Sequence, residues 1–307
     1  ANLFSVTVQQ VISGPVYSVG PGWILVDQSI ANRDCASAWA DRMRRHLSTP
    51  HLLPLRPGTA LEDIASNSLP AIEEARNYLA EMTGVEGELA GRTVLIVEGT
   101  PLLPYLLARR GVQVTVTTRS RRYASFLRGC SRQRRVEESV IVLDGPFEVA
   151  HDSGPFDLVI GSAALYTLEI ESTIGRLLDL VAGTLHLFWP ESAPPQHRFL
   201  AGMWPEVHGA PYVEPPYASS LAQVLDCLGY HFTYTSVEVR EPVIYPTIGD
   251  AVADCAARMG GVDRRGEGHL RRALRTSLTM QKEGLRFRGT YRRAQFVIPA
   301  RAAAGDR

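Results

Sequence analysis

Residues suited to contact a ligand follow two apolar stretches of this 307-residue chain. The stretches are Val94–Val97 and Phe156–Ile160, and the residues that follow them are Glu98, Gly99, Thr100, Ser162 and Tyr166. Carboxylates and phenols at such positions can bind, orient or deprotonate a substrate group. Because open α/β sheets bind ligands at the carboxyl ends of their strands, we interpret both segments as parts of one site. The alternatives are a turn without function at Glu98 and a Tyr166 that packs beneath a neighbouring loop.

Residues 189–220 form a segment rich in proline and aromatic residues, with no clear helical or strand periodicity. This pattern predicts a long functional loop, here a lid over the site. Glu191 is the first candidate for a general base, because a strand is predicted to end just before it, and His197 is another candidate. Substrate contacts are predicted for Trp189, His208 and Tyr212. The spacing of the histidines and acids is not that of a metal site, so no metal is expected.

Arginines are concentrated in residues 119–135, where they are Arg119, Arg121, Arg122, Arg128, Arg132, Arg134 and Arg135. Guanidinium groups make bidentate contacts with phosphate, sulfate and carboxylate groups. The cluster therefore predicts either the recognition of an anion or a solvated basic helix. Arg119 and Arg122 are the two candidates for anion binding.

Alternating strands and helices are predicted to position these residues. The strands are Val94–Val97, Val112–Thr117, Ser139–Leu143, Phe156–Ile160, Thr184–Phe188 and Tyr230–Arg240, with Leu285–Ile298 as a final strand or hairpin. The helices are Leu102–Arg110, one beginning at Tyr123–Arg128, Ile170–Val181 and Leu221–Leu228. The first five strands are almost continuously apolar, which is typical of a parallel sheet that is buried on both faces.

Two further segments flank this pattern. Residues 1–88 are predicted to be an α+β appendage that caps the active site or forms a dimer contact. Its elements are short strands in residues 4–27, a helix over Ala31–Leu47, a proline-rich linker over 51–58 and a helix within Thr59–Met82. Residues 247–283 are predicted to be an arginine-rich helical insertion in the core, which spans residues 89–307.

Four passages together resemble a known family. They are Leu106–Thr115, Leu143–Gly145 with Gly154–Val159, Leu177–Leu185 and Leu228–Tyr230. In order and spacing they resemble class I methyltransferases, which bind S-adenosylmethionine (SAM), over roughly residues 90–240. The resemblance implies a Rossmann-like α/β sheet with helices on both faces.

The resemblance also implies a SAM site made of three parts. The family's first loop is an acid followed by alternating glycines, where this chain has Glu98, Gly99, Thr100 and then Pro101. The family places an acid for the ribose at the end of the second strand, where this chain has Thr118 followed by Arg119. Asp144 stands where the family's acid contacts the adenine amino group, and Ser162 and Tyr166 stand near the reacting atoms. The first two parts therefore depart from the family and the third is retained.

Three functions are consistent with a SAM site that keeps one of the family's three parts and departs from the other two. The first is an enzyme of small-molecule, secondary (natural-product) metabolism that transfers a methyl group from SAM by in-line displacement. The second is a scaffold that has lost SAM and catalyses displacement, elimination or cyclisation with a sulfate or phosphate leaving group, resembling aziridine-forming enzymes. The third is a pseudoenzyme that binds a partner subunit.

The composition limits the kinds of partner that the chain is expected to bind. The formal net charge is zero and the aromatic residues are not interleaved with the basic runs, so nucleic acid is not an expected partner. The expected partners are a small substrate, anionic or carrier-bound, and a partner subunit or further copies of the chain. No apolar run of about 18 residues predicts a membrane span. Four scattered cysteines without a Cys-x-x-Cys pair, and no apparent signal peptide, indicate a reducing cytoplasm.

Overall fold

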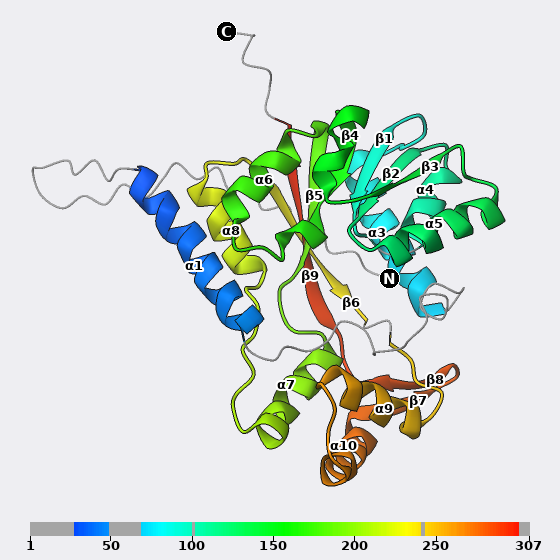
Figure 1. Ribbon diagram of the computed structural model, residues 1–307, viewed down its shortest axis with the longest axis vertical. Coiled ribbons are helices and arrows are strands. Elements are labelled where there is room, and N and C mark those ends of the chain that lie inside the picture. Colours follow the sequence, from blue (N-terminus) through cyan, green and yellow to red (C-terminus); the bar gives the residue numbers. More distant parts are fainter. Residues whose placement is uncertain (1–27, 49–68, 100–101, 241–242, 301–307) are drawn as a thin grey trace, which may run out of the picture.

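One mixed sheet organises the chain (Figure 1). The computed structural model describes residues 28–48, 69–99, 102–240 and 243–300. Within these residues the sheet has seven strands in the order β3-β2-β1-β4-β5-β9-β6. Their bounds are β1 Thr93–Val97, β2 Gln113–Thr118, β3 Val140–Asp144, β4 Phe156–Ile160, β5 Val181–Pro190, β6 Thr233–Val239 and β9 Tyr291–Pro299. Strands β1 to β5 are parallel, and β9 runs antiparallel between β5 and β6.

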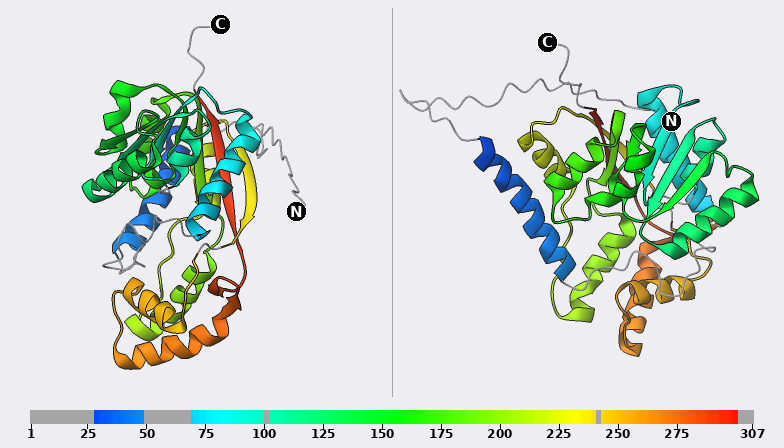
Figure 2. Two further views of the ribbon diagram at one scale, coloured as in Figure 1. Left: turned by 90° about the vertical axis from the view of Figure 1, so that its right-hand side faces the viewer. Right: turned by 45° about the horizontal axis from the view of Figure 1, so that its top comes forward.

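Helices cover both faces of this sheet (Figure 2). Because successive side chains of a strand point to opposite faces, Leu95 and Val97 of β1 enter one core and Val94 and Ile96 enter the other. The first core is completed by α1 (Gln28–Ser48), α6 (Ile170–Leu178) and α8 (Ala218–Cys227). The second is completed by α3 (Leu69–Glu86), α4 (Leu103–Ala108) and α5 (Arg121–Arg134). The predicted α/β class with helices on both faces is confirmed.

Helices α1 and α3 are built into the two cores of the sheet. Trp39 and Met43 of α1 lie in the first core, and Leu79 and Met82 of α3 lie in the second. A disulfide between Cys35 and Cys227 joins α1 to α8. This bond was not expected, and it does not fit the reducing environment that the scattered cysteines indicated. The strands expected in residues 4–27, the linker 51–58, the beginning of the second helix and the C-terminal tail lie outside the described residues.

A smaller unit lies beyond the carboxyl end of β5, at the bottom of Figure 1. It contains α7 (Pro195–His208), α9 (Ile248–Arg258), α10 (Arg264–Ser277) and a hairpin of β7 (Leu278–Gln281) and β8 (Gly284–Phe287) around a core of its own. The expectation of an irregular segment over 189–220 is wrong for 195–208, which are helical. Pro195 stands in the first turn, where proline is tolerated, and Leu200 and Trp204 face this core one turn apart. The helix predicted to reach 283 ends at Ser277, and β7 follows it.

In the described part of the chain, no helix is both long and apolar enough to cross a membrane.

Candidate active site

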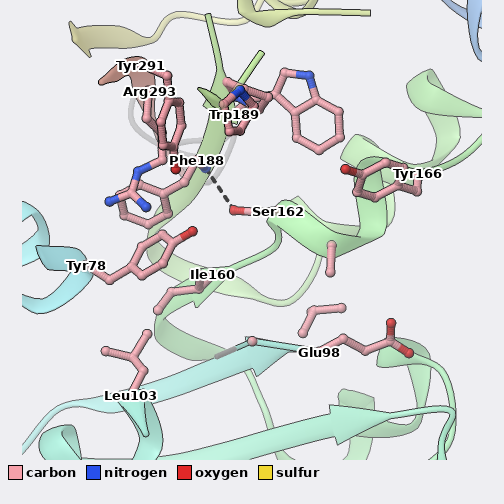
Figure 3. Close-up of a pocket in the computed structure, with 15 residues that line it drawn as sticks. Tyr78, Glu98, Leu103, Ile160, Ser162, Tyr166, Phe188, Trp189, Tyr291 and Arg293 are labelled. Carbon is pink, nitrogen blue, oxygen red and sulfur yellow. Dashed lines mark hydrogen bonds between the residues drawn. The ribbon is translucent and has the colours of Figure 1, made fainter. Parts of the chain in front are cut away.

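A cavity of about 270 Å³ lies at the carboxyl ends of β1, β4 and β5 (Figure 3). Its walls are mainly aromatic, and the aromatic residues are Tyr78, Tyr166, Phe188, Trp189 and Tyr291. Three residues with polar side chains also line it, namely Glu98, Ser162 and Arg293. Pockets of this composition, with a few polar groups among aromatic walls, are typical of sites for small organic ligands. We call it the larger cavity because a smaller one, described below, adjoins it.

Tyr78 presents a hydroxyl group to one end of the larger cavity. The hydroxyl points into the cavity between Phe188 and Ile160 (Figure 3) and has no hydrogen-bond partner among the described residues. Two neighbours fix its ring: the Arg293 guanidinium lies 3.9 Å above the ring centre, and the Phe188 ring meets it edge-on at 4.7 Å. Burial raises the pKa of Tyr78 above its ordinary value of 10, so the phenol stays protonated and is suited to donate a hydrogen bond.

The Arg293 side chain is held in place by a buried ion pair. Its Nη2 atom lies 2.5 Å from Oε1 of Glu81, and the side chains are 4% and 10% exposed. Burial raises the pKa of the Glu81 carboxyl, and the Arg293 guanidinium opposes that rise. Nε of Arg293 and Oε2 of Glu81 are buried and have no hydrogen-bond partner in the part of the chain that the structure describes. The pair thus orients the wall of the larger cavity with part of its hydrogen-bonding capacity unused.

Ser162 and Trp189 form the other wall of the larger cavity. The Ser162 hydroxyl oxygen accepts a hydrogen bond from the backbone N–H of Phe188 at 2.8 Å, which leaves its own hydrogen available to a ligand. The Trp189 indole donates to the carbonyl of Pro216 at 2.8 Å and lies 5.0 Å from the exposed Tyr166 ring. Both residues of the predicted Ser162–Tyr166 segment therefore lie at this cavity.

A smaller cavity of about 110 Å³ adjoins the larger one. The two share Val97, Glu98, Ala163 and Tyr166 as lining residues, so they form two compartments of one cleft. The smaller cavity is also lined by the ends of β2 and β4 and the turn after β3, through Thr117, Arg119, Gly145, Pro146, Phe147 and Ala164, and by Thr167, Thr173 and Arg176. It contains both apolar surface and cationic side chains.

The turn after β1 stands between the two cavities. Glu98 has a φ of 47°, in the left-handed region that non-glycine residues rarely adopt. A Cβ atom on Gly99 would lie 2.2 Å from Cγ2 of Ile96, so a side chain there would force the buried Ile96 side chain to move. Tyr123 also donates a hydrogen bond to the Gly99 carbonyl at 2.9 Å. Glycine is therefore required at the second position of this turn; Thr100 lies outside the described residues.

The other residues implied by the family resemblance lie around the smaller cavity. The Thr118 side chain is buried and accepts a hydrogen bond from the backbone of Ser120 at 3.1 Å, whereas Arg119 lines the cavity. Asp144 ends β3 next to the lining turn, with its side chain 36% exposed and its Oδ2 atom 3.7 Å from Nε of Arg121. Arg122 is exposed and does not line either cavity.

The candidates from the proline-rich segment are dispersed. Trp189 lines the larger cavity, but the Glu191 carboxylate is bound by Arg292 at 2.9 Å and by the Tyr234 hydroxyl, and Glu191 does not line it. His197, His208 and Tyr212 cluster around Trp204 in the smaller unit. Tyr212 also lines a separate, open cavity of about 590 Å³ between α1 and α7. The structure therefore does not bring these histidines to the cleft, and their roles stay predictions.

His197 should remain neutral well below the usual range of histidine. Burial, with smaller contributions from His46 and Arg258, lowers its pKa from 6.5 to about 4. Its neutral form therefore stabilises the fold above pH 6.5, and this contribution is lost as the pH falls towards 4. In an NMR titration, the resonance that disappears in His197→Gln should have a midpoint near pH 4; a midpoint near 6.5 would show that the ring is solvated.

The sequence did not identify Tyr78, Arg293 or Thr117 as site residues. Tyr78 lies on α3, which was assigned to the appendage, and Arg293 lies on the last strand of the sheet. Both reach the larger cavity only through tertiary structure. Thr117 could have been found from strand alternation, because it is adjacent to Thr118 and points to the opposite side of β2. Among the described residues, no three His, Cys, Asp or Glu side chains are grouped in a way that could hold a metal ion.

Comparison with known proteins gave matches among solved structures alone. No protein-family model and no curated protein matches the chain. The YcgJ protein from Bacillus subtilis is 14% identical, with 74% of this chain and 100% of that chain covered and a TM-score of 0.49. The [4+2]-cyclase SpnF is 14% identical, with 90% and 96% covered and a TM-score of 0.47. Magnesium protoporphyrin IX methyltransferase from Synechocystis PCC 6803, with bound SAH (S-adenosylhomocysteine), is 12% identical, with 89% and 99% covered and a TM-score of 0.45.

The strand order of the sheet is the clearest likeness in fold to known proteins. Five parallel strands in the order β3-β2-β1-β4-β5, followed by an antiparallel β9 between β5 and β6, form the sheet typical of class I methyltransferases. The sequence patterns predicted where the strands lie but not which strands are neighbours in the sheet. In its fold the chain thus resembles the class I SAM-dependent methyltransferases.

Proposed function

We propose that this chain binds SAM across the two compartments of the cleft and transfers its methyl group to a small organic molecule in the larger cavity. The observation that carries the proposal is the cleft itself. On a methyltransferase-type sheet, two adjoining cavities open at the carboxyl ends of β1, β2, β4 and β5. Ligands of open α/β sheets bind at this edge.

The residues of the smaller cavity fit an adenosyl group. Phe147, Pro146 and Ala164 provide apolar surface for a planar base. Asp144 stands beside this surface with a partly exposed carboxylate, and its ion pair with Arg121 is long, at 3.7 Å, so it can accept a hydrogen bond from an amino group. The turn of Glu98 and Gly99 leads from here to the larger cavity. SAM, when bound, supplies an electrophilic methyl group on a sulfonium ion.

The larger cavity would orient the acceptor molecule. Its aromatic walls favour a planar apolar skeleton and exclude water. The Tyr78 and Ser162 hydroxyls can donate hydrogen bonds to an oxygen of that molecule, since Tyr78 stays protonated and the Ser162 oxygen is already engaged by Phe188. Catalysis would then rest mainly on proximity and orientation of the two reactants.

Isothermal titration calorimetry with SAM and with SAH tests the proposal. We expect micromolar binding of both ligands to the wild-type chain. Asp144→Ala should weaken the binding of both ligands by about tenfold, because it removes a hydrogen bond that the ligand donates to a charged acceptor. Asp152→Asn is the matched control, since Asp152 is exposed, lies on the following 3-10 helix (Phe147–Ser153) and does not line either cavity. Absence of SAM and SAH binding to the wild-type chain would refute the proposal.

One observation favours a second candidate function. The Arg119 side chain lines the smaller cavity and has no acidic partner among the described residues. It could hold a sulfate or phosphate leaving group on a scaffold that does not use SAM. Binding of inorganic sulfate that is lost in Arg119→Ala, together with no binding of SAM, would support this candidate.

A further inference from the structure

The Tyr78 and Ser162 hydroxyls point towards one another in the larger cavity (Figure 3). No hydrogen bond joins them, and neither hydroxyl hydrogen has an acceptor among the described residues. The Ser162 oxygen already accepts a hydrogen bond from the backbone N–H of Phe188 at 2.8 Å. The two hydroxyls therefore have two hydrogens to donate, and a ligand oxygen between them can accept both.

The charge beside Tyr78 strengthens it as a donor. The Arg293 guanidinium lies 3.9 Å from the centre of the Tyr78 ring. Burial raises the pKa of Tyr78, and the largest electrostatic effect on it, that of Arg293, opposes the rise; the effects of Glu74, Tyr291 and Glu81 are each smaller. A protonated phenol stacked on a cation donates most strongly to an oxygen that carries negative charge. The Tyr78 end of the cavity therefore favours an electron-rich ligand oxygen.

Two kinds of charged ligand group fit this end poorly. An ammonium group would face two donors, because Glu98, the carboxylate that lines the cavity in the described part of the chain, lies on the Tyr166 side, away from Tyr78 (Figure 3). A carboxylate brings two oxygens with about four acceptor sites. The two hydroxyls satisfy part of these, and the rest would be buried against aromatic walls at a cost in free energy. A single oxygen attached to a ring matches the two donors better.

We propose that the molecule bound in the larger cavity is a phenol, whose oxygen is held in its ionised form between Tyr78 and Ser162. The aromatic side chains of Phe188, Trp189 and Tyr291 favour the planar ring of such a molecule. The proposal rests on the proposed function and names its substrate class. A methyl acceptor must offer an electron pair to the sulfonium ion, and a phenolate offers one at its oxygen and at ring carbons. A ketone oxygen accepts the same hydrogen bonds but is a poor nucleophile.

Four naphthalene derivatives that differ in one group are the probes. They are 2-naphthol, naphthalene, 2-naphthoate and 2-naphthylmethylammonium. Calorimetry with SAH present should show that the wild-type chain binds 2-naphthol at least about tenfold more tightly than each of the others, as expected for hydrogen bonds to a charged oxygen. The absorbance of the naphtholate ion reports the ionisation of the bound probe. Its midpoint in a pH titration should fall by about one unit on binding, which corresponds to tenfold tighter binding of the ion.

Tyr78→Phe removes one donor and keeps the aromatic ring. It should lower the preference for 2-naphthol over naphthalene by about tenfold and return the titration midpoint towards that of the free probe. Ser162→Ala should change both quantities in the same direction. Tyr234→Phe is the matched control, because it also removes a tyrosine hydroxyl, but Tyr234 lies on β6 and lines neither cavity. The melting temperature of each variant shows whether the fold is retained.

The outcomes separate the phenol site from the proposed function. If SAH binds but the wild-type chain does not prefer 2-naphthol, or binds it without a change in its ionisation, the phenol site is refuted and the proposed function stands. The same holds if a folded Tyr78→Phe keeps the full preference. If 2-naphthol binds as its anion but neither SAM nor SAH binds, the proposed function fails, and with it the assignment of the phenol as a methyl acceptor.

Discussion

Replacing Arg293 with methionine is expected to lower the free energy of unfolding by about 3–5 kcal/mol at pH 8, the effect typical of breaking a buried ion pair. The substitution would leave the Glu81 carboxyl, 10% exposed, without its cation. It would also remove the guanidinium that stacks on Tyr78 at 3.9 Å. Urea denaturation followed by circular dichroism measures the change.

The pH dependence of the stability of Arg293→Met tests whether a buried ionised carboxyl causes the loss. Burial already raises the pKa values of Glu81 and of the nearby Glu74, and loss of the Arg293 charge would raise both further. A carboxyl whose pKa is higher in the folded state than in the unfolded state favours folding only when it is protonated. The stability of Arg293→Met should therefore increase as the pH falls from 8 to 5, and its difference from the wild-type chain should narrow.

Two comparisons separate the buried charge from other effects. The double variant Glu81→Met, Arg293→Met removes both charges and should recover most of the lost stability. Arg292→Met is the control on the neighbouring residue: its ion pair with Glu191 has the same kind of partners at 2.9 Å, but the Arg292 side chain is 62% exposed. An exposed pair is worth about 0–1 kcal/mol. Equal losses in Arg292→Met and Arg293→Met would contradict the assignment of a buried, structurally important pair.

The strands of the sheet were predictable because their physical signal is local. A parallel strand covered on both faces must be apolar at nearly every position, and Phe156–Ile160 shows this in the sequence and in the structure. The strand of Val94–Val97 and the turn after it were found for the same reason. The irregular segment assigned to 189–220 was wrong over α7 because Pro205 interrupts the helical pattern, whereas packing of Leu200 and Trp204 in the smaller unit stabilises the helix.

The candidate site was predictable only where strand ends define it. Glu98, Ser162 and Tyr166 follow buried strands directly, and the structure places all three at the cleft. Tyr78 and Arg293 come together through α3 and β9, whose contact with the site depends on long-range packing that no local pattern encodes. The positive φ of Glu98 could not be predicted from the sequence either, because a glutamate favours a negative φ.

Glu86→Gln is expected to lower the free energy of unfolding by about 3 kcal/mol at pH 7, an effect similar in size to that of Arg293→Met. The Glu86 carboxylate joins α3 to the sheet: its Oε1 atom accepts from Nε2 of the buried His186 at 2.8 Å and from Thr184 at 2.6 Å, and its Oε2 atom accepts from Arg92 at 2.7 Å. The hydrogen bond from His186, followed by those from Thr184 and Arg92, lowers the pKa of Glu86 from 4.5 to about 2 against the effect of burial. Since one pKa unit corresponds to about 1.4 kcal/mol, this difference corresponds to about 3 kcal/mol.

The sign of the pH dependence makes the Glu86 prediction specific. A carboxyl whose pKa is lowered by folding stabilises the folded state above its unfolded pKa, and this contribution is lost as the pH falls from 4.5 to about 2. The wild-type chain and Glu86→Gln should therefore differ most above pH 5 and converge towards pH 2 in urea denaturation. Glu88→Gln, which alters an exposed carboxylate two residues away, should leave the profile unchanged. A constant difference between wild type and Glu86→Gln at all pH values would show that the glutamine disturbs packing, and that the ionised carboxylate is not what holds α3 against β5.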